Sequence, residues 1–254
     1  MENLGYLLED DDISPAVKRR SRTQTAASAQ LENVSKKYLF VKRLADVVLS
    51  FLAVIVLSVP MLLIALAVFL QDFHNPIFKR VTKDGRFFTM YKFRTMCVNA
   101  EQKLEELRAQ NEADGPVFKM KKDPRVTPIG RFLRKTSLDE LPELWNIFKG
   151  DMSLIGPRPL LVSYLPWYTE REKLRHTVRP GLTGLAQVSG RNYIAWDNRL
   201  EKDVEYVEHL SFAMDVKVFF KTIQVLFAED DVAVDTDVIE GNLAEIRAAA
   251  RMEK

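Results

Sequence analysis

One uninterrupted apolar run dominates the hydrophobic pattern of the chain. Residues 47–70 are 24 consecutive positions without a charged side chain. A helix rises 1.5 Å per residue, so the run would measure about 36 Å, more than the roughly 30 Å of a bilayer's hydrocarbon core. The run starts far into the chain, is too long for a signal peptide and is followed by no small-residue cleavage signal. We therefore expect a segment that is inserted in a membrane.

Pro60, near the centre of the run, bears on how this segment lies. Proline removes a backbone N–H and favours a kink or break, and the Ser58 hydroxyl can bond backbone groups that a break frees. Residues 22–46 hold five cations and residues 71–96 hold six, so both flanks have the charge typical of cytoplasmic segments. A re-entrant helix-break-helix that enters and leaves by the same leaflet satisfies both observations and is our prediction. One kinked span is the alternative.

The remaining pattern predicts a mainly α-helical protein with a small β-hairpin. Residues 77–93 alternate apolar and polar positions around an Asp-Gly pair, which is typical of a hairpin. Helical periodicity occupies residues 99–113 and 202–227, and residues 123–137 form a loop that leads into a short helix. Residues 164–176 are amphipathic and aromatic, which suits either the membrane interface or a helix packed on the protein's own core.

Four segments follow from these patterns. Residues 1–38 contain little that could form a core, and we expect a disordered tail able to touch anionic lipid. The membrane helices occupy residues 39–72, and a folded domain on the cytoplasmic face occupies residues 73–227. The acidic residues 228–254 form a helix or a tail.

Charge and cysteine content narrow the class of ligand. The net charge of +2 conceals a basic middle, because residues 79–135 hold 15 Lys and Arg against 7 Asp and Glu, whereas residues 225–254 hold 3 against 8. Nucleic acid, lipid headgroups and a phosphorylated small molecule are all anions that this middle could meet. One cysteine excludes an internal disulfide, and three scattered histidines have no zinc-ligand spacing. An oxygen-ligated metal fits this composition better.

The stretch RKTSLDELPELWN, residues 134–146, sets two carboxylates side by side. Ser137 and Glu140 match a helix capping box, although Pro142 fits that register poorly and Asp139 is the alternative cap. In either register the pair lies in the first turn of a helix. The N-terminus of that helix would stabilise negative charge and keep Asp139 ionised. Such a motif on its own is most often structural.

Basic side chains around the pair favour chemistry. Arg134 precedes it, and the stiff sequence GPRP carries Arg158 after it. The arginine fork suits bidentate phosphate binding. Two adjacent carboxylates among such cations can bind Mg²⁺, attack phosphorus, or do both. The further candidate cations, each of which could instead belong to a solvated basic face, are Lys92, Arg94, Arg131, Lys135, Arg179 and Arg191.

Residues 42–226 resemble the bacterial sugar transferases, the monotopic phosphoglycosyl transferases that start glycoconjugate assembly on a polyprenol phosphate. The matching stretches follow in the family's order: KRLAD, YKFRTM, LRKTSLDELPELWNIFKGDMSLIGPRP, RHTVRPGLTGLAQVSGRN and DVKVFFKTI. The resemblance implies a mainly helical fold with a β-hairpin, anchored by a re-entrant helix that is broken at a Ser-Pro pair. Here Val59 separates Ser58 from Pro60, which leaves the geometry of the break in question.

The resemblance implies a polyprenyl-phosphate hexose-1-phosphate transferase. Such an enzyme moves a sugar-1-phosphate from a UDP-sugar to undecaprenyl phosphate, releases UMP and uses Mg²⁺. Asp139 would be the nucleophile that carries a covalent phospho-sugar, and Glu140 would assist and hold the metal. The family's phosphate-neutralising positions fall here on Lys92, Arg134, Arg158 and Arg191.

The resemblance also implies a biological setting. The reaction is the first membrane step in making exopolysaccharide, lipopolysaccharide O-antigen, capsule or glycoprotein glycan, at the cytoplasmic face of the bacterial inner membrane. An inactive membrane-surface scaffold that binds anionic lipid is the alternative. A nucleic-acid partner is not expected, because the chain has the charge but no recognition motif. The sugar and the oligomeric state, a homodimer included, stay open.

Overall fold

The computed structural model of the protein describes residues 34–84, 86–112, 118, 120, 122–190 and 195–227. Our predictions for residues 1–33 and 228–254 lie outside the described residues, and so does the candidate Arg191.

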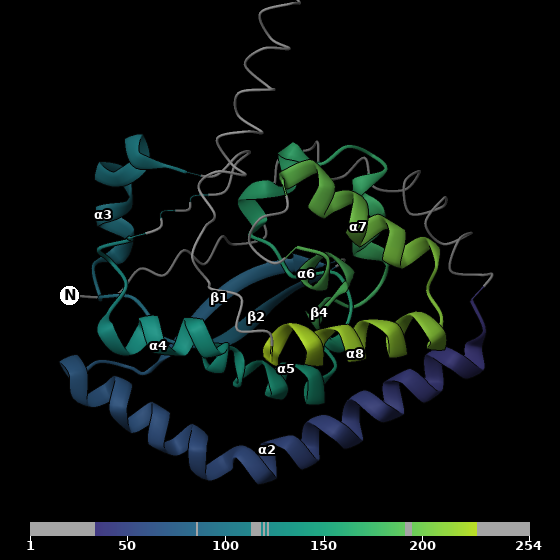
Figure 1. Cartoon of the computed structure of the whole chain (residues 1–254), viewed down its shortest axis with the longest axis horizontal. Helices are drawn as coiled ribbons and strands as arrows, with labels where there is room; N and C mark the ends of the chain where they lie inside the picture. Colours follow the sequence, from purple (N-terminus) through teal and green to yellow (C-terminus); the bar gives the residue numbers. More distant parts are fainter. Residues whose placement is uncertain are drawn as a thin grey trace, which may run out of the picture.

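The predicted membrane segment is one long helix. α2 (Lys36–Asp72) runs through Pro60 without interruption and ends at Phe73, which has a left-handed backbone with φ 57°. Figure 1 shows that the helix bends near its middle. We attribute the bend to Pro60, which removes a helical hydrogen bond and crowds the preceding turn. A bent continuous helix therefore replaces the predicted break, and it begins before the expected boundary at residue 39.

By length and composition, α2 is the one helix within the described ranges that could cross a membrane. Its most apolar window has a mean hydropathy of 2.9, and only 6% of that window is buried in the protein. Large side chains such as Val56 and Leu62 are 74% and 69% exposed. The Ser58 hydroxyl donates to the carbonyl of Ile55 at 2.7 Å, one residue before the carbonyl that Pro60 leaves without its helical donor. The outward face of α2 is thus almost wholly apolar.

The predicted hairpin is confirmed. β1 (Ile77–Asp84) and β2 (Arg86–Phe93) pair antiparallel, with Asp84 opposite Arg86. A short parallel pair, β3 (Ser153–Ile155) with β4 (Gly181–Thr183), was not predicted. The other α-helices are α3 (Ala100–Leu107), α4 (Pro128–Thr136), α5 (Glu143–Lys149), α6 (Leu185–Val188), α7 (Trp196–Glu208) and α8 (Phe212–Phe227). Single 3-10 segments cover Arg108–Gln110, Leu138–Glu140, Val162–Trp167 and Glu172–Thr177.

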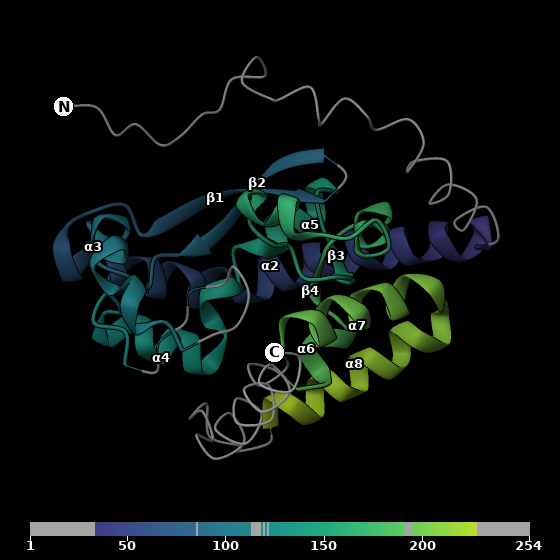
Figure 2. The ribbon, with the colours of Figure 1, turned by 90° about the horizontal axis from the view of Figure 1, so that it is seen from above.

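The described elements other than α2 lie on the inner side of its bend (Figures 1 and 2). The inner face of α2 packs into the hydrophobic core, so α2 is part of the folded domain. Ala53, Val54 and Leu57 pack with side chains from β2 and α5, and Met61, Ile64 and Ala65 pack with side chains from β2 and α4. A third cluster joins Tyr38 to α6, α7 and α8.

Both ends of α2 are also bound to the same folded body by charged groups. Near the start, Lys42 Nζ lies 2.8 Å from Asp215 Oδ2, and Asp46 Oδ1 accepts from the backbone N–H of Leu154 at 2.9 Å. At the end, two guanidinium nitrogens of Arg94 each donate to Asp72 at 2.5 Å. One rigid domain therefore spans the helix from end to end.

Residues 164–176 do not form the predicted amphipathic helix. Two 3-10 segments, Val162–Trp167 and Glu172–Thr177, cover part of this stretch, and residues 168–171 connect them. Tyr168 is buried and stacks on Trp196 with ring centroids 6.1 Å apart, and Tyr164 meets the same indole edge-on. Packing on the protein's own core, the second of our two interpretations, is the correct one for these tyrosines.

Candidate active site

The adjacent carboxylates lie in a 3-10 turn between two helices, and the predicted capping box is wrong. Ser137 ends α4 with a left-handed backbone (φ 57°, ψ 16°), and its side chain makes no capping hydrogen bond. Asp139 and Glu140 follow in the turn Leu138–Glu140, and α5 begins only at Glu143. The pattern S-x-x-E therefore marks the end of one helix and not the start of the next.

Helix α4 brings Arg134 to the turn by packing closely on the chain that follows β2. The Thr127 hydroxyl accepts from the backbone N–H of Gly130 at 3.0 Å and caps the helix. A Cβ at Gly130 would lie 2.0 Å from the carbonyl oxygen of Thr95, so only glycine allows this approach. Arg134 Nε then donates to Thr95 Oγ1 at 2.9 Å. The Thr95 side chain, which does not belong to the carboxylate turn, therefore holds the Arg134 guanidinium near Asp139.

Two cations converge on one oxygen of Glu140. Lys92 Nζ from β2 lies 2.7 Å from Glu140 Oε1, and a terminal nitrogen of Arg158 lies 2.5 Å from the same atom. Lys92 Nζ is also 2.9 Å from Oε1 of Glu143, the first residue of α5. The Arg158 side chain is 35% exposed, whereas that of Glu143 is 3% exposed. The cluster is thus sealed at Glu143 and open to solvent at Arg158.

A buried amide places Lys92. Asn146 of α5 accepts from the backbone N–H of Tyr91 at 3.1 Å and donates to the carbonyl of Thr89 at 2.7 Å. These two bonds join α5 to β2 at the residues before and after Met90. The register that they fix puts Lys92 between the carboxylates of Glu140 and Glu143.

The GPRP turn that carries Arg158 is fixed by backbone bonds to β4. The N–H of Gly156 donates to the carbonyl of Thr183, and the N–H of Gly181 donates to the carbonyl of Pro157, both at 2.9 Å. A Cβ at Gly156 would lie 2.5 Å from the carbonyl oxygen of Arg179, so a larger residue would push the segments apart. The prediction that this sequence holds Arg158 on a stiff backbone is confirmed.

Burial and the cations move the carboxylate pKa values in opposite directions. Burial works against ionisation of Glu140, but Arg158 and Lys92 outweigh it and lower its pKa to about 2. Burial raises the pKa of Glu143 to about 7, since Lys92 only partly offsets it. Burial and the charge of Glu140 also raise the pKa of Asp139, against Lys92, Arg134 and Arg158. These cations, and not the predicted helix N-terminus, favour the ionised form of Asp139.

Comparison with known proteins decides the family of this site. Residues 37–229 match the family described as bacterial sugar transferase. The chain belongs to this family. It is 42% identical over 200 residues to the undecaprenyl-phosphate galactose phosphotransferase of Salmonella typhimurium, a match that covers 75% of this chain and 41% of that protein.

Two further relatives differ in length, and one of them is named for a different sugar. The uncharacterized sugar transferase EpsL of Bacillus subtilis is 39% identical over 197 residues, which are 76% of this chain and 91% of that protein. The UDP-N-acetylgalactosamine-undecaprenyl-phosphate N-acetylgalactosaminephosphotransferase of Aeromonas hydrophila is 39% identical over 198 residues, which are 74% of this chain and 44% of that protein. The chain therefore spans less than half of the length of the Salmonella and Aeromonas proteins.

The candidate cations that the structure describes divide into three groups. Lys92, Arg134 and Arg158 lie beside the carboxylates, and their charges lower the pKa of Asp139 against burial. Arg94 instead pairs with Asp72 at the end of α2, and Arg179 donates to the carbonyl of Gly150. Arg131 and Lys135 are exposed on α4.

Sequence reasoning missed Glu143 and Asn146. The spacing of Glu143 three residues after Glu140 was a usable signal, because residues three apart share a face of a helical turn. No pattern in the sequence marks Asn146 as the link between α5 and β2.

The donor set suits a metal that is shared with a substrate. Within the described ranges, no three Asp, Glu, His or Cys side chains gather as a closed metal site. Mg²⁺ in proteins is commonly held by one or two carboxylates together with water and substrate phosphate oxygens. Asp139 and Glu140 of the sugar transferase can supply the two carboxylates, so the residues fit Mg²⁺ bound together with a diphosphate.

Proposed function

We propose that the protein transfers a sugar-1-phosphate from a UDP-sugar to undecaprenyl phosphate and releases UMP. The observation that carries this proposal is the convergence of Lys92 and Arg158 on Glu140 Oε1, next to Asp139. Relatives of 42% and 39% identity are named for the transfer of galactose phosphate and N-acetylgalactosamine phosphate to undecaprenyl phosphate. A cluster that concentrates positive charge beside a nucleophilic carboxylate suits phosphoryl transfer, which depends on positioning and charge neutralisation.

We propose a double displacement at one phosphorus atom. A carboxylate oxygen of Asp139 forms a bond to the phosphorus that bears the sugar, and the bond from that phosphorus to the bridging oxygen breaks. UMP leaves with the electron pair, and the sugar-phosphate remains on Asp139 as an acyl phosphate. An oxygen of undecaprenyl phosphate then attacks the same phosphorus, and the Asp139 carboxylate leaves. No net proton is needed in either step.

The charged residues have separate tasks in this scheme. Arg158 is 35% exposed, so its guanidinium can turn from Glu140 to a substrate phosphate. Lys92 stays between Glu140 and Glu143, and its charge favours the ionised form of Asp139. Arg134 balances the charge of Asp139. Mg²⁺, held by Asp139 and Glu140, would neutralise the diphosphate and stabilise the leaving UMP.

The nucleophile is tested by Asp139→Asn with a radiolabelled UDP-sugar. We expect quenched wild-type protein to retain labelled sugar-phosphate, and the variant to retain none and to release no UMP. A panel that includes UDP-galactose and UDP-N-acetylgalactosamine would also identify the sugar. The matched control is Asp197→Asn, which makes the same change at an exposed position of α7 and should label fully. Full labelling of Asp139→Asn would exclude it as the nucleophile, and absence of both labelling and UMP release in the wild type would favour an inactive lipid-binding scaffold.

We propose that α2 is re-entrant and that the active site faces the cytoplasm at the inner membrane. Ion pairs bind both ends of α2 to one folded domain. Because that domain lies on one side of the bilayer, both ends of α2 must lie on the same side. Further exposed apolar side chains lie on α4, α5 and α8, namely Phe132, Trp145, Phe212, Phe219 and Phe220. An active site at the height of the membrane surface would meet the phosphate of a lipid acceptor.

Single cysteines at Lys37 and His74, introduced after Cys97→Ser, test this arrangement. Both positions are exposed, Lys37 in the first turn of α2 and His74 just after its end. A membrane-impermeant maleimide should label both from the cytoplasmic side of oriented vesicles and neither from the other side. Labelling of the two cysteines from opposite sides would mean that α2 spans the bilayer.

A further inference from the structure

The carbonyl of Arg158 is held by a second, fully buried arginine. A terminal nitrogen of Arg175 donates to the carbonyl oxygen of Arg158. The same guanidinium donates to Asp203 Oδ2 of α7, from Nε at 3.1 Å and from a terminal nitrogen at 3.0 Å. The side chains of Arg175 and Asp203 are 0% and 1% exposed. A charge pair so deeply buried has no access to a soluble ligand.

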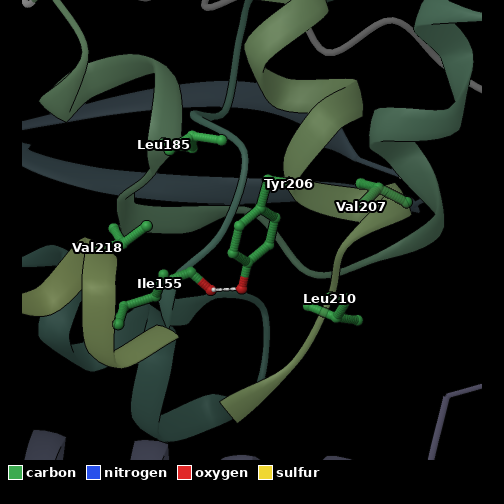
Figure 3. Close-up of a cluster of buried hydrophobic side chains, with 6 residues drawn as sticks. All are labelled: Ile155, Leu185, Tyr206, Val207, Leu210 and Val218. Atoms are coloured by element: carbon green, nitrogen blue, oxygen red, sulfur yellow. Dashed lines mark hydrogen bonds between the residues drawn. The ribbon is translucent and has the colours of Figure 1, made fainter. Parts of the chain in front are cut away.

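The other end of the same turn also meets α7. Tyr206 Oη lies 3.1 Å from the carbonyl oxygen of Ile155, as Figure 3 shows, and 2.7 Å from Asp215 Oδ1. Its single proton is shared between these two acceptors, so this contact is weaker than the one at Arg158. Asp203 and Tyr206 are three residues apart and lie on one face of α7. One face of α7 therefore contacts Ile155 directly and Arg158 through Arg175.

We propose that Arg175, anchored by Asp203, is a positioning residue that sets the Arg158 guanidinium against Glu140. The Arg158 side chain is open to solvent and must stay directed while its partner changes from carboxylate to phosphate. Only its backbone can be fixed without blocking that exchange, and the Arg175 fork fixes it by joining a carboxylate and a carbonyl in one plane. Arg175 touches no reacting atom. This inference rests on the proposed function.

The test is a double-mutant cycle with Arg175→Lys and Arg158→Ala. Lysine keeps the charge beside Asp203 but cannot reproduce the planar fork. Loss of a hydrogen bond to a charged donor lowers kcat for UMP release by about 10-fold or more. In the Arg158→Ala background the same substitution should change kcat by less than about 2-fold, because its target is gone. Equal fold-changes in both backgrounds would overturn the proposal.

A matched control and a second measurement separate positioning from folding and from the proposed function. Arg171→Lys makes the same substitution at an exposed arginine that also pairs with α7 carboxylates, and it should leave kcat unchanged. In ¹⁵N-arginine spectra, the Nε–H signal of Arg158, assigned with Arg158→Lys, should broaden or shift in Arg175→Lys and stay unchanged in Arg171→Lys. An unchanged Arg158 signal in Arg175→Lys overturns the inference even if the protein transfers no sugar. An inactive wild type overturns only the proposed function.

Discussion

Two clusters of ion pairs flank Arg158, and they differ in their access to solvent. On the side of its guanidinium, Glu140 is 17% and Lys92 is 14% exposed. On the side of its carbonyl, Arg175 and Asp203 are 0% and 1% exposed. The first cluster contains three carboxylates and the second contains one.

The difference separates ion pairs that exchange partners from ion pairs that hold a shape. In the open cluster, Lys92 and Arg158 share one carboxylate oxygen, and the partly exposed Arg158 can turn to an arriving phosphate while Lys92 keeps its carboxylates. In the sealed pair, the charges have already lost their water and cannot exchange partners. A partner lost from the sealed pair therefore destabilises the fold, whereas a partner lost from the open cluster changes charge and reactivity.

The largest expected effect follows from opening the sealed pair. Asp203→Ala leaves the Arg175 guanidinium buried without its carboxylate, and loss of one partner of a buried pair costs about 3–5 kcal/mol. Urea unfolding in detergent should show this loss in the free energy of unfolding. Glu201→Ala removes a carboxylate from the exposed side of the same helix and should leave the free energy of unfolding unchanged. Equal losses in the two variants would contradict the distinction drawn here.

The open cluster is expected to respond to pH with a smaller effect. The pKa of Glu143 is raised to about 7, so the native state holds this proton more tightly than the unfolded chain does. Its contribution to stability is complete below about pH 4.5 and is lost as the pH rises to about 7. Glu143→Gln keeps the shape of the side chain without its charge. At pH 8 its free energy of unfolding should exceed that of wild type by on the order of 1–3 kcal/mol.

Comparison of urea unfolding at pH 5 and pH 8 provides the control within one experiment. The Glu143→Gln and wild-type free energies should be close at pH 5 and differ at pH 8. The contribution of Glu140 to stability depends on pH in the opposite direction. Its pKa is lowered to about 2, so this contribution is lost only as the pH falls below about 4.5. Parallel pH profiles of wild type and Glu143→Gln would mean that Glu143 is ionised throughout this range.

Local sequence patterns predicted the elements that depend on neighbours in the chain. The apolar run predicted α2, and the alternation around residues 84 and 85 predicted the hairpin. Both depend on periodicity along the chain. The GPRP sequence predicted a stiff backbone for Arg158, and backbone bonds to β4 add to that restraint. Pro60 alone could not show whether the helix would break or bend, because packing of α2 along the domain supplies the restraint.

Features that depend on distant contacts could not be predicted. β3 and β4 have three residues each, too few for a visible alternation. The S-x-x-E pattern fits a helix start and a helix end equally well until the contact of Gly130 with Thr95 places α4. The spacing of Glu143 after Glu140 is visible in the sequence, but its burial depends on the packing of α5 on β2. Arg175 lies in a stretch with amphipathic spacing, and its burial is set by Asp203, which lies 28 residues later.

The smallest expected effect concerns the backbone at the open cluster. Ser137 has φ 57°, a conformation that favours glycine, whereas neither Arg175 nor Asp203 has a positive φ. Its side chain makes no capping hydrogen bond that glycine would lose. Ser137→Gly should therefore raise the free energy of unfolding by about 0.5–1 kcal/mol in urea, with Thr136→Gly inside α4 as a destabilising control. If Ser137→Gly instead leaves stability unchanged and lowers UMP release, the serine hydroxyl serves the substrate, and the open cluster then extends to the residue that starts its turn.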